Sequence, residues 1–200
     1  PQYAEAHNNR GITLASLDRR KESEESFRRA LEINPNYSEA HNNLGKKFFN
    51  EDNIEEAIES FEKAVLISPR YADAYTNLGK CCAIQGDLER AIEMFDQAID
   101  SAKDFPDPYL ARSDAYLGRN RSDDRLAIED LEKAISLNPS NLQGYHQLCA
   151  VYLDRNRVFE AISVAVRGLE VSPNDAKLNR HLGFCLVHKT ISDPYASLLK

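Results

Sequence analysis

Apolar and small residues recur along the chain in two alternating blocks, and both blocks have helical spacing. In the first block they stand at i, i+3, i+4 and i+7, as in Tyr75, Leu78, Gly79 and Cys82. In the second block they stand at i, i+1, i+4, i+7 and i+8, as in residues 91–99. Both spacings collect apolar side chains on one face of an α-helix, whereas a strand would alternate them. The pattern therefore predicts an all-α protein made of short amphipathic helices.

The two blocks together form a unit that recurs along the chain. Residues 4–11 return almost unchanged at 38–45 and again, with more changes, at 72–79, which is a spacing of 34 residues each time. Repeats of this length are typical of stacked helical hairpins, because one hairpin cannot bury both of its faces. We expect a single solenoid over residues 1–200, with units at 4–37, 38–71, 72–105, 106–141 and 142–175 and a partial unit at 176–200.

Turn-forming residues separate and close the predicted helices. Residues 52–53 and 86–87 lie between the two helices of a unit, and a proline such as Pro35 stops the second helix because it lacks an N–H donor. The fourth unit is two residues longer around positions 119–125. Its first helix is predicted to restart with Asp107 as N-cap and Pro108 as the first helical residue.

Glycines inside the predicted first helices indicate close helix contacts. Gly45 and Gly79 stand at the same position of successive units. Glycine costs about 1 kcal/mol in a helix interior, so its repetition favours a place where a neighbouring helix leaves no room for a side chain.

These repeats resemble the tetratricopeptide repeat (TPR) family over essentially the whole chain. The resemblance rests on a large residue near the start of each first helix, on the Leu-Gly pairs, on an Ala-x3-Phe-x2-Ala block and on the closing proline. Arg10, Lys103 and Cys149 depart from it, since they replace the expected Leu, Pro and Gly. The resemblance implies a right-handed superhelical α-solenoid whose first helices line a concave groove. It also implies a non-catalytic scaffold for protein–protein interaction.

A row of asparagines is the candidate binding site. On a helical wheel Asn9, Asn43 and Asn77 point away from the packing stripe at the same position of three consecutive units. An amide both donates and accepts hydrogen bonds, so such a row could pair with the backbone of an extended peptide. The row resembles the asparagine ladder in the TPR domain of O-GlcNAc transferase. The residues expected to bind a peptide are therefore Asn9, Asn43, Asn77, Asn8, Asn42, Lys46 and Lys80, and the ladder stops at Ala111, Gln147 and His181.

These positions have two other interpretations. Asparagine can simply be a tolerated polar residue on a solvated helix face. Another TPR binding mode is a carboxylate clamp for the acidic tail of a chaperone, but its basic positions read here as Asn8, Asp73 and Asn77. Because Asp73 would repel a carboxylate, the sequence argues against a clamp of that type.

Charge and composition narrow the class of partner. The net charge is −7 with a sequence pI near 5.3, which argues against nucleic acid because phosphate binding needs clustered Lys and Arg. No stretch approaches the roughly 20 apolar residues of a membrane helix, and no signal peptide is evident. The four cysteines form no C-x-x-C motif, so we expect a reduced, cytoplasmic setting.

No arrangement of residues in the sequence points to catalysis, a cofactor or a metal. His181, Cys185 and His188 stand at i, i+4 and i+7 and could present two imidazoles and a thiolate to zinc, but a fourth ligand is not evident. Cys81 and Cys82 are expected to pack in a helix rather than react. There is no phosphate-binding loop and no hydrolase motif.

Features near the C-terminus and at the two ends leave further possibilities open. Residues 158–171 are apolar beyond one stripe, so either the last hairpin or a partner protein covers Val164 and Val166, and we expect the hairpin to do so. A second helix of the last unit could begin at Pro194. Residues 1–3 match the closing pattern of a repeat, which suggests a piece of a longer repeat protein; the alternative is a short natural protein with a truncated final helix. Two alternatives follow: the substrate-recruiting arm of a larger enzyme such as a glycosyltransferase, or a scaffold that self-associates through uncapped ends.

Overall fold

The computed structural model describes residues 3–192 and the side chains of residues 3–187, and over that range it is helical without strands. The chain divides into two compact units, residues 1–103 and 104–200. The second helix predicted from Pro194 and the side chain of His188 lie outside the described residues.

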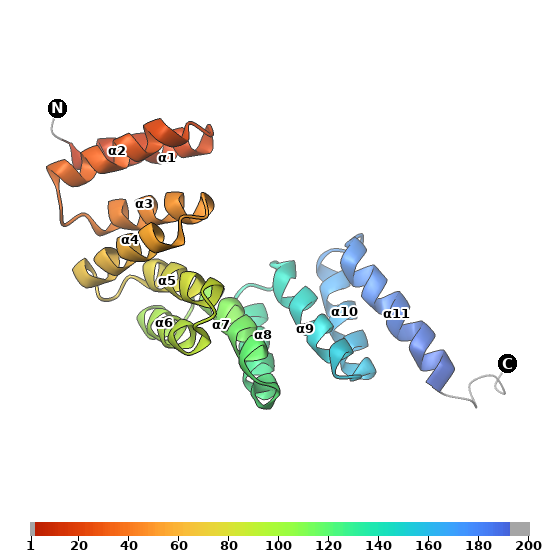
Figure 1. Ribbon diagram of the computed structural model, residues 1–200. Coiled ribbons are helices and arrows are strands. Elements are labelled where there is room, and N and C mark those ends of the chain that lie inside the picture. The colour runs from red at the N-terminus through yellow and green to blue at the C-terminus, as the bar shows by residue number, and fades with distance from the viewer. Residues whose placement is uncertain (1–2, 193–200) are drawn as a thin grey trace. The chain divides into compact units, whose positions relative to one another are not determined.

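The first unit consists of helices that pair in chain order (Figure 1). Each first helix packs against the second helix of its own hairpin, and α2 packs on α3 as α4 packs on α5. The hairpins therefore stack, as the repeat period predicts. The helices are α1 (Ala4–Ser16), α2 (Arg20–Ile33), α3 (Ser38–Asn50), α4 (Ile54–Ile67), α5 (Ala72–Ile84) and α6 (Leu88–Ser101).

The second unit repeats this arrangement with one change. A short 3₁₀ turn, η1 (Arg121–Asp123), occupies the predicted two-residue extension of the fourth repeat. The helix α7 begins at Asp107 with Pro106 before it, so the prediction that Asp107 is the N-cap is wrong by one residue. The other helices are α8 (Asp124–Leu137), α9 (Leu142–Asp154), α10 (Val158–Val171) and α11 (Ala176–Ser192).

The repeated glycines lie where the two helices of a hairpin come closest. A Cβ atom added to Gly11, Gly45 or Gly79 would lie 2.5–2.6 Å from the Cε1 atom of the phenylalanine on the second helix. Those phenylalanines, Phe27, Phe61 and Phe95, are all at most 2% exposed. Only glycine fits without displacing the ring, which confirms the predicted close contact.

Later repeats fill the same pair of positions differently. Leucine replaces phenylalanine on the second helix of the fourth repeat, where Ser113 stands in the glycine position and Leu131 in the aromatic one. In the fifth repeat Cys149 faces α10, and its Sγ lies 3.5 Å from the carbonyl oxygen of Ala161, while Ala165 takes the aromatic position. The residue in the glycine position thus becomes larger where the residue facing it becomes smaller. The smaller Ala165 therefore makes room for Cys149 in place of glycine.

The turns within the hairpins use one backbone conformation. Asp18, Asp52, Gly86 and Asn156 have φ values between 55° and 82°, in the left-handed region. Asp, Asn and Gly tolerate this region best, because a short polar side chain or none avoids the steric clash. The turn positions at 52–53 and 86–87 are therefore confirmed.

Two further observations concern apolar surface. Val164 is buried, but Val166 on α10 is 43% exposed, so the expectation that the last hairpin covers both valines is wrong for Val166. The apolar residues around α10 thus extend beyond what its described neighbours cover. No helix among the described residues is both long enough and apolar enough to cross a membrane.

Candidate functional site

The exposed residues of α1, α3 and α5 form aligned stripes, which we name the first-helix face. On each helix the stripe runs through positions i, i+4 and i+7, which share one side of an α-helix. All of these residues are exposed or partly exposed. They are Glu5, Asn9 and Ile12 on α1; Glu39, Asn43 and Lys46 on α3; and Asp73, Asn77 and Lys80 on α5.

Across the three helices, equivalent residues make three rows. The carboxylate row consists of Glu5, Glu39 and Asp73, and the amide row consists of Asn9, Asn43 and Asn77. The lysine row consists of Lys46 and Lys80, with Ile12 at the equivalent position of α1. Side-chain hydrogen bonds join α1 to α3 and α3 to α5 at the level of the amide row, so the helices lie side by side there. The expected placement of Asn9, Asn43 and Asn77 on one face agrees with this geometry.

Asn8 and Asn42 occupy a different place from the one expected. Both are 4% exposed, so neither flanks the amide row on the surface. The Nδ2 atom of Asn43 donates to Oδ1 of Asn8 at 2.9 Å, and that of Asn77 donates to Oδ1 of Asn42 at 3.1 Å. Each buried amide thus holds the partly exposed amide of the following repeat.

A tyrosine at the end of the second repeat completes this network. Asn42 Nδ2 donates to the hydroxyl oxygen of Tyr71 at 3.2 Å. Burial, with the nearby carboxylates of Asp73 and Glu39, raises the pKa of Tyr71 to about 12, so the phenol is neutral at physiological pH. The chain Asn77–Asn42–Tyr71 therefore fixes the orientation of the Asn77 amide and satisfies the buried polar atoms of Asn42.

The sequence interpretation missed this tyrosine network. Tyr3, Tyr37 and Tyr71 recur immediately before the first helices, with the same period as the asparagines. That regularity was a usable signal, because a tyrosine hydroxyl that becomes buried needs a hydrogen-bond partner.

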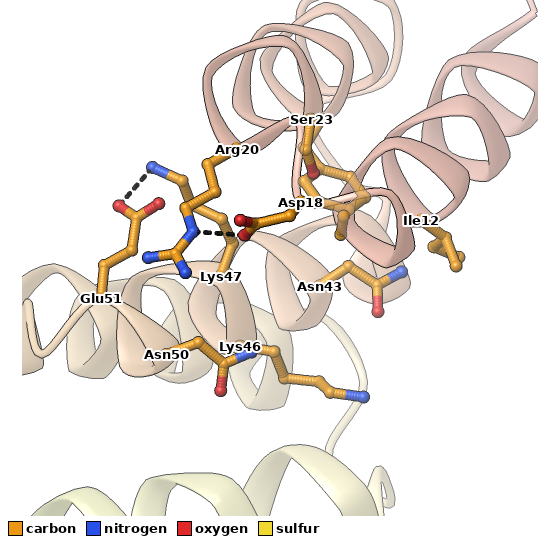
Figure 2. A pocket seen from close by; sticks show the side chains of 11 residues that line it. Ile12, Asp18, Arg20, Ser23, Asn43, Lys46, Lys47, Asn50 and Glu51 are labelled. Carbon is orange, nitrogen blue, oxygen red and sulfur yellow. Dashed lines mark hydrogen bonds and ion pairs between the residues drawn. The ribbon is translucent and has the colours of Figure 1, made fainter.

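A pocket opens beside the amide row between α1 and α3, with a volume of about 210 Å³ (Figure 2). Ile12, Ala15 and Phe27 contribute apolar surface, and Asn43 and Lys46 line it from α3. It lies at the position where the lysine row carries isoleucine rather than lysine.

The charged residues around the pocket are mostly paired with one another. Arg20 Nε lies 2.7 Å from Asp18 Oδ1, and Lys47 Nζ lies 2.8 Å from Glu51 Oε2, as the dashed lines in Figure 2 show. Lys47 also pairs with Glu24. Lys46 is exposed, and among the described residues it forms no ion pair. Its ammonium group is therefore available to a ligand.

The amide row does not continue into the second unit. Ala111 takes its position in the fourth repeat and Gln147 in the fifth. Gln147 Nε2 donates to the carboxylate oxygens of Asp114 at 2.7 and 2.8 Å, so this amide is engaged within the unit. The candidate site therefore lies on the first unit.

The described cysteines lie in apolar surroundings. Cys81, Cys82, Cys149 and Cys185 are buried and free. Burial raises the pKa of all four thiols, to about 12 for Cys81 and Cys149, which disfavours the reactive thiolate. Among the described residues no group of three or more His, Cys, Asp and Glu could hold a metal. The remaining member of the candidate set, His188, has no described side chain.

Comparison with known proteins identifies the family. Models of the tetratricopeptide repeat match residues 4–37, 36–104 and 107–141. The chain belongs to the tetratricopeptide repeat family. The solved structure of MamA matches this TPR chain with a TM-score of 0.72 and 25% identity, covering 84% of this chain and 96% of MamA. A thermophilic TPR protein from Thermus thermophilus matches with a TM-score of 0.70 and 24% identity, covering 92% of this chain and 99% of that one.

A curated relative matches a shorter part of the TPR chain. Protein O-mannosyl-transferase TMTC3 from Mus musculus is 37% identical over 51 residues, which is 26% of this chain and 6% of that protein. The match therefore covers only a small part of the relative. Together the repeat models and structural neighbours support a protein-interaction scaffold built on the TPR fold.

Proposed function

We propose that this TPR chain is a non-catalytic scaffold that holds an extended segment of another protein on its first-helix face. The observation that carries the proposal is the amide row with its buried supports. Asn43 and Asn77 each have one amide donor fixed by a buried asparagine, which leaves the second N–H and the carbonyl oxygen for a ligand.

Fixed amides suit the backbone of an extended peptide. Such a backbone offers N–H and C=O groups at every residue, and an amide can pair with both kinds of group. Orienting the amides before binding lowers the entropy lost on association. A row with these properties selects an extended backbone, and the side chains on either side of the row decide which sequences are preferred.

A peptide array tests the proposal. The variant with Asn9→Ala, Asn43→Ala and Asn77→Ala should lose most of the peptides that the wild type retains. Each net hydrogen bond contributes about 0.5–1.5 kcal/mol, so three should weaken the Kd by at least about tenfold. The matched control carries Lys21→Ala, Glu25→Ala and Gln97→Ala, which are exposed residues on second helices.

The folded state must be compared as well, because Asn43 and Asn77 bond to buried groups. Asn9 is exposed, and among the described residues its side chain makes no hydrogen bond, so Asn9→Ala alone should leave the helical circular dichroism unchanged and still weaken binding. Undiminished peptide retention by both the triple and the single variant would remove the amide row from the proposal.

The likeness to TMTC3 favours a second candidate function, the substrate-recruiting TPR arm of a larger glycosyltransferase. It rests on the 51 matched residues of that O-mannosyl-transferase. The natural coding sequence around this region decides it: a transferase domain in the same chain would support it, and a chain made only of repeats would refute it.

A further inference from the structure

We propose that the segment held by the first-helix face has two oppositely charged edges, with basic side chains on one edge and acidic side chains on the other, and one large apolar side chain on the acidic edge. This inference rests on the proposed function, since it names the kind of partner segment that the amide row holds.

Opposite charges are separated across the first-helix face. The carboxylate row and the lysine row are seven residues apart on each helix, or about 10 Å at 1.5 Å per residue. The amide row lies between them. Lys46 and Lys80 form no ion pair with Glu39 or Asp73, or with any other described residue. Two rows of opposite sign therefore face solvent on the two sides of the amides.

The segment held on the amide row is an extended chain. Its side chains point alternately to opposite sides, so odd and even residues form two edges. When the backbone lies along the amide row, one edge meets Glu5, Glu39 and Asp73 and the other meets Lys46 and Lys80. Opposite charges attract across each edge, whereas a segment of uniform charge would be repelled by one of the rows.

First-turn carboxylates also stabilise the N-termini of their own helices. That effect accounts for Glu5, Glu39 and Asp73 without a ligand, but it does not account for the lysines. A lysine that served only its own helix could pair with a carboxylate four residues away, as Lys63 does with Glu59 at 2.6 Å. The corresponding partners of Lys46 and Lys80 are Asn50 and Ile84 on one side and Asn42 and Thr76 on the other, none of which is charged.

A pocket lies at the α1 end of the lysine row. Here Ile12 replaces lysine, and the surface deepens into the pocket of about 210 Å³ that Ala15 and Phe27 also line. An apolar cavity of about 150 Å³ can take up a benzene-sized molecule, so this pocket has room for one leucine or phenylalanine side chain. In Figure 2 the Asp18–Arg20 and Lys47–Glu51 pairs lie together on one side of the pocket, and Ile12 lies on the other.

Two synthetic peptides with the same composition test the charge pattern. Both are fluorescein-labelled, about ten residues long, and carry equal numbers of Lys and Glu and one Leu. In the first, Lys and Glu alternate strictly, with Leu in register with Glu, so the two edges have opposite charge. In the second, Lys and Glu come in pairs, so each edge is mixed. Fluorescence anisotropy with the full chain should give a Kd about tenfold lower for the alternating peptide, a preference that shrinks at about 0.5 M NaCl.

Variants show which residues produce the preference. Lys46→Glu with Lys80→Glu should abolish it, whereas Lys21→Glu with Lys133→Glu, which changes net charge equally at other exposed positions, should keep it. Replacing Leu by Ser in the alternating peptide should weaken binding to the wild type several-fold. Far-UV circular dichroism of each variant checks that it remains folded.

The outcomes separate this inference from the proposed function. Equal binding of the two peptides, or a preference unchanged by Lys46→Glu with Lys80→Glu, would overturn the charge pattern. So would failure of both peptides to bind while the array yields binders that depend on the amide row, and in that case the proposed function stands. If no array peptide depends on Asn9, Asn43 and Asn77, the proposed function fails as well.

Discussion

Gly45→Ala probes the helix contact on which every hairpin of the first unit depends. The new Cβ would lie 2.6 Å from Cε1, 2.8 Å from Cδ1 and 3.0 Å from Cζ of Phe61. Non-bonded carbon atoms prefer about 3.5–4.0 Å, so the ring would have to move by about 1 Å. Phe61 is 0% exposed, so it can move only by displacing the core.

The magnitude follows from two opposing effects. Overpacking of this kind costs about 1–3 kcal/mol, while replacing glycine by alanine inside a helix contributes about 1 kcal/mol of stability. We expect a net loss of about 0–2 kcal/mol in the free energy of unfolding. For a chain of this size, this lowers Tm by up to about 8 °C in a circular dichroism melt.

A double-mutant cycle locates the cause of the loss. Phe61→Leu shortens the side chain opposite, as Leu131 does in the fourth repeat. The double variant should therefore be more stable than the sum of the single effects, by more than the roughly 0.5 kcal/mol within which independent sites add. Gly183→Ala is the matched control, because no described atom lies within 4 Å of the added Cβ. If Gly45→Ala stabilised the protein, or if the cycle were additive, the contact argument would be wrong.

Two further predictions concern ionisable groups. The thiols of Cys81, Cys82, Cys149 and Cys185 should react with a thiol reagent at pH 8 far more slowly in the native protein than in urea, because burial raises their pKa values; rapid native labelling would contradict this. The hydrogen bond from Lys47 lowers the pKa of Glu24 in the folded state. The stabilisation that the Glu24 carboxylate gives to the folded state is thus fully present above its unfolded pKa of about 4.3 and is lost as the pH falls through its lower folded pKa. Urea midpoints of Glu24→Gln should lie below the wild type at pH 7 and converge with it at acid pH, whereas Glu25→Gln, on the exposed side of α2, should track the wild type.

The sequence predicted the fold well because its signals are local. Helical spacing, the 34-residue repeat, the left-handed turn residues and the glycines opposite Phe27, Phe61 and Phe95 all act within one hairpin. A helical wheel also placed Asn43 and Asn77 on an exposed stripe correctly. Each of these inferences needed only one repeat and its period.

The places of Asn8 and Asn42 could not be obtained in this way. A wheel treats each helix alone, whereas these residues are buried by other helices and by the chain between them, as the bond from Asn42 to the tyrosine 29 residues later shows. The pocket beside Ile12 was missed for the same reason, because α1, α2 and α3 all contribute to its walls. Contacts between repeats thus determine the details of the site, whereas contacts within a repeat determine the fold.

The point at which the amide row ends indicates that the asparagines of the first unit act in pairs. Each supported amide needs a buried asparagine in one repeat and an exposed asparagine 35 residues later, as in Asn8 with Asn43 and Asn42 with Asn77. At the next step both members change together, to Thr76 and Ala111. The Thr76 hydroxyl donates to the carbonyl oxygen of Ala72 in its own helix, so it needs no partner in another repeat. Polar residues that were merely tolerated by solvent would have no reason to disappear as a pair. The two asparagines of a supporting pair are expected to be replaced together, because either one without the other leaves a buried amide unsatisfied or a surface amide without a fixed orientation.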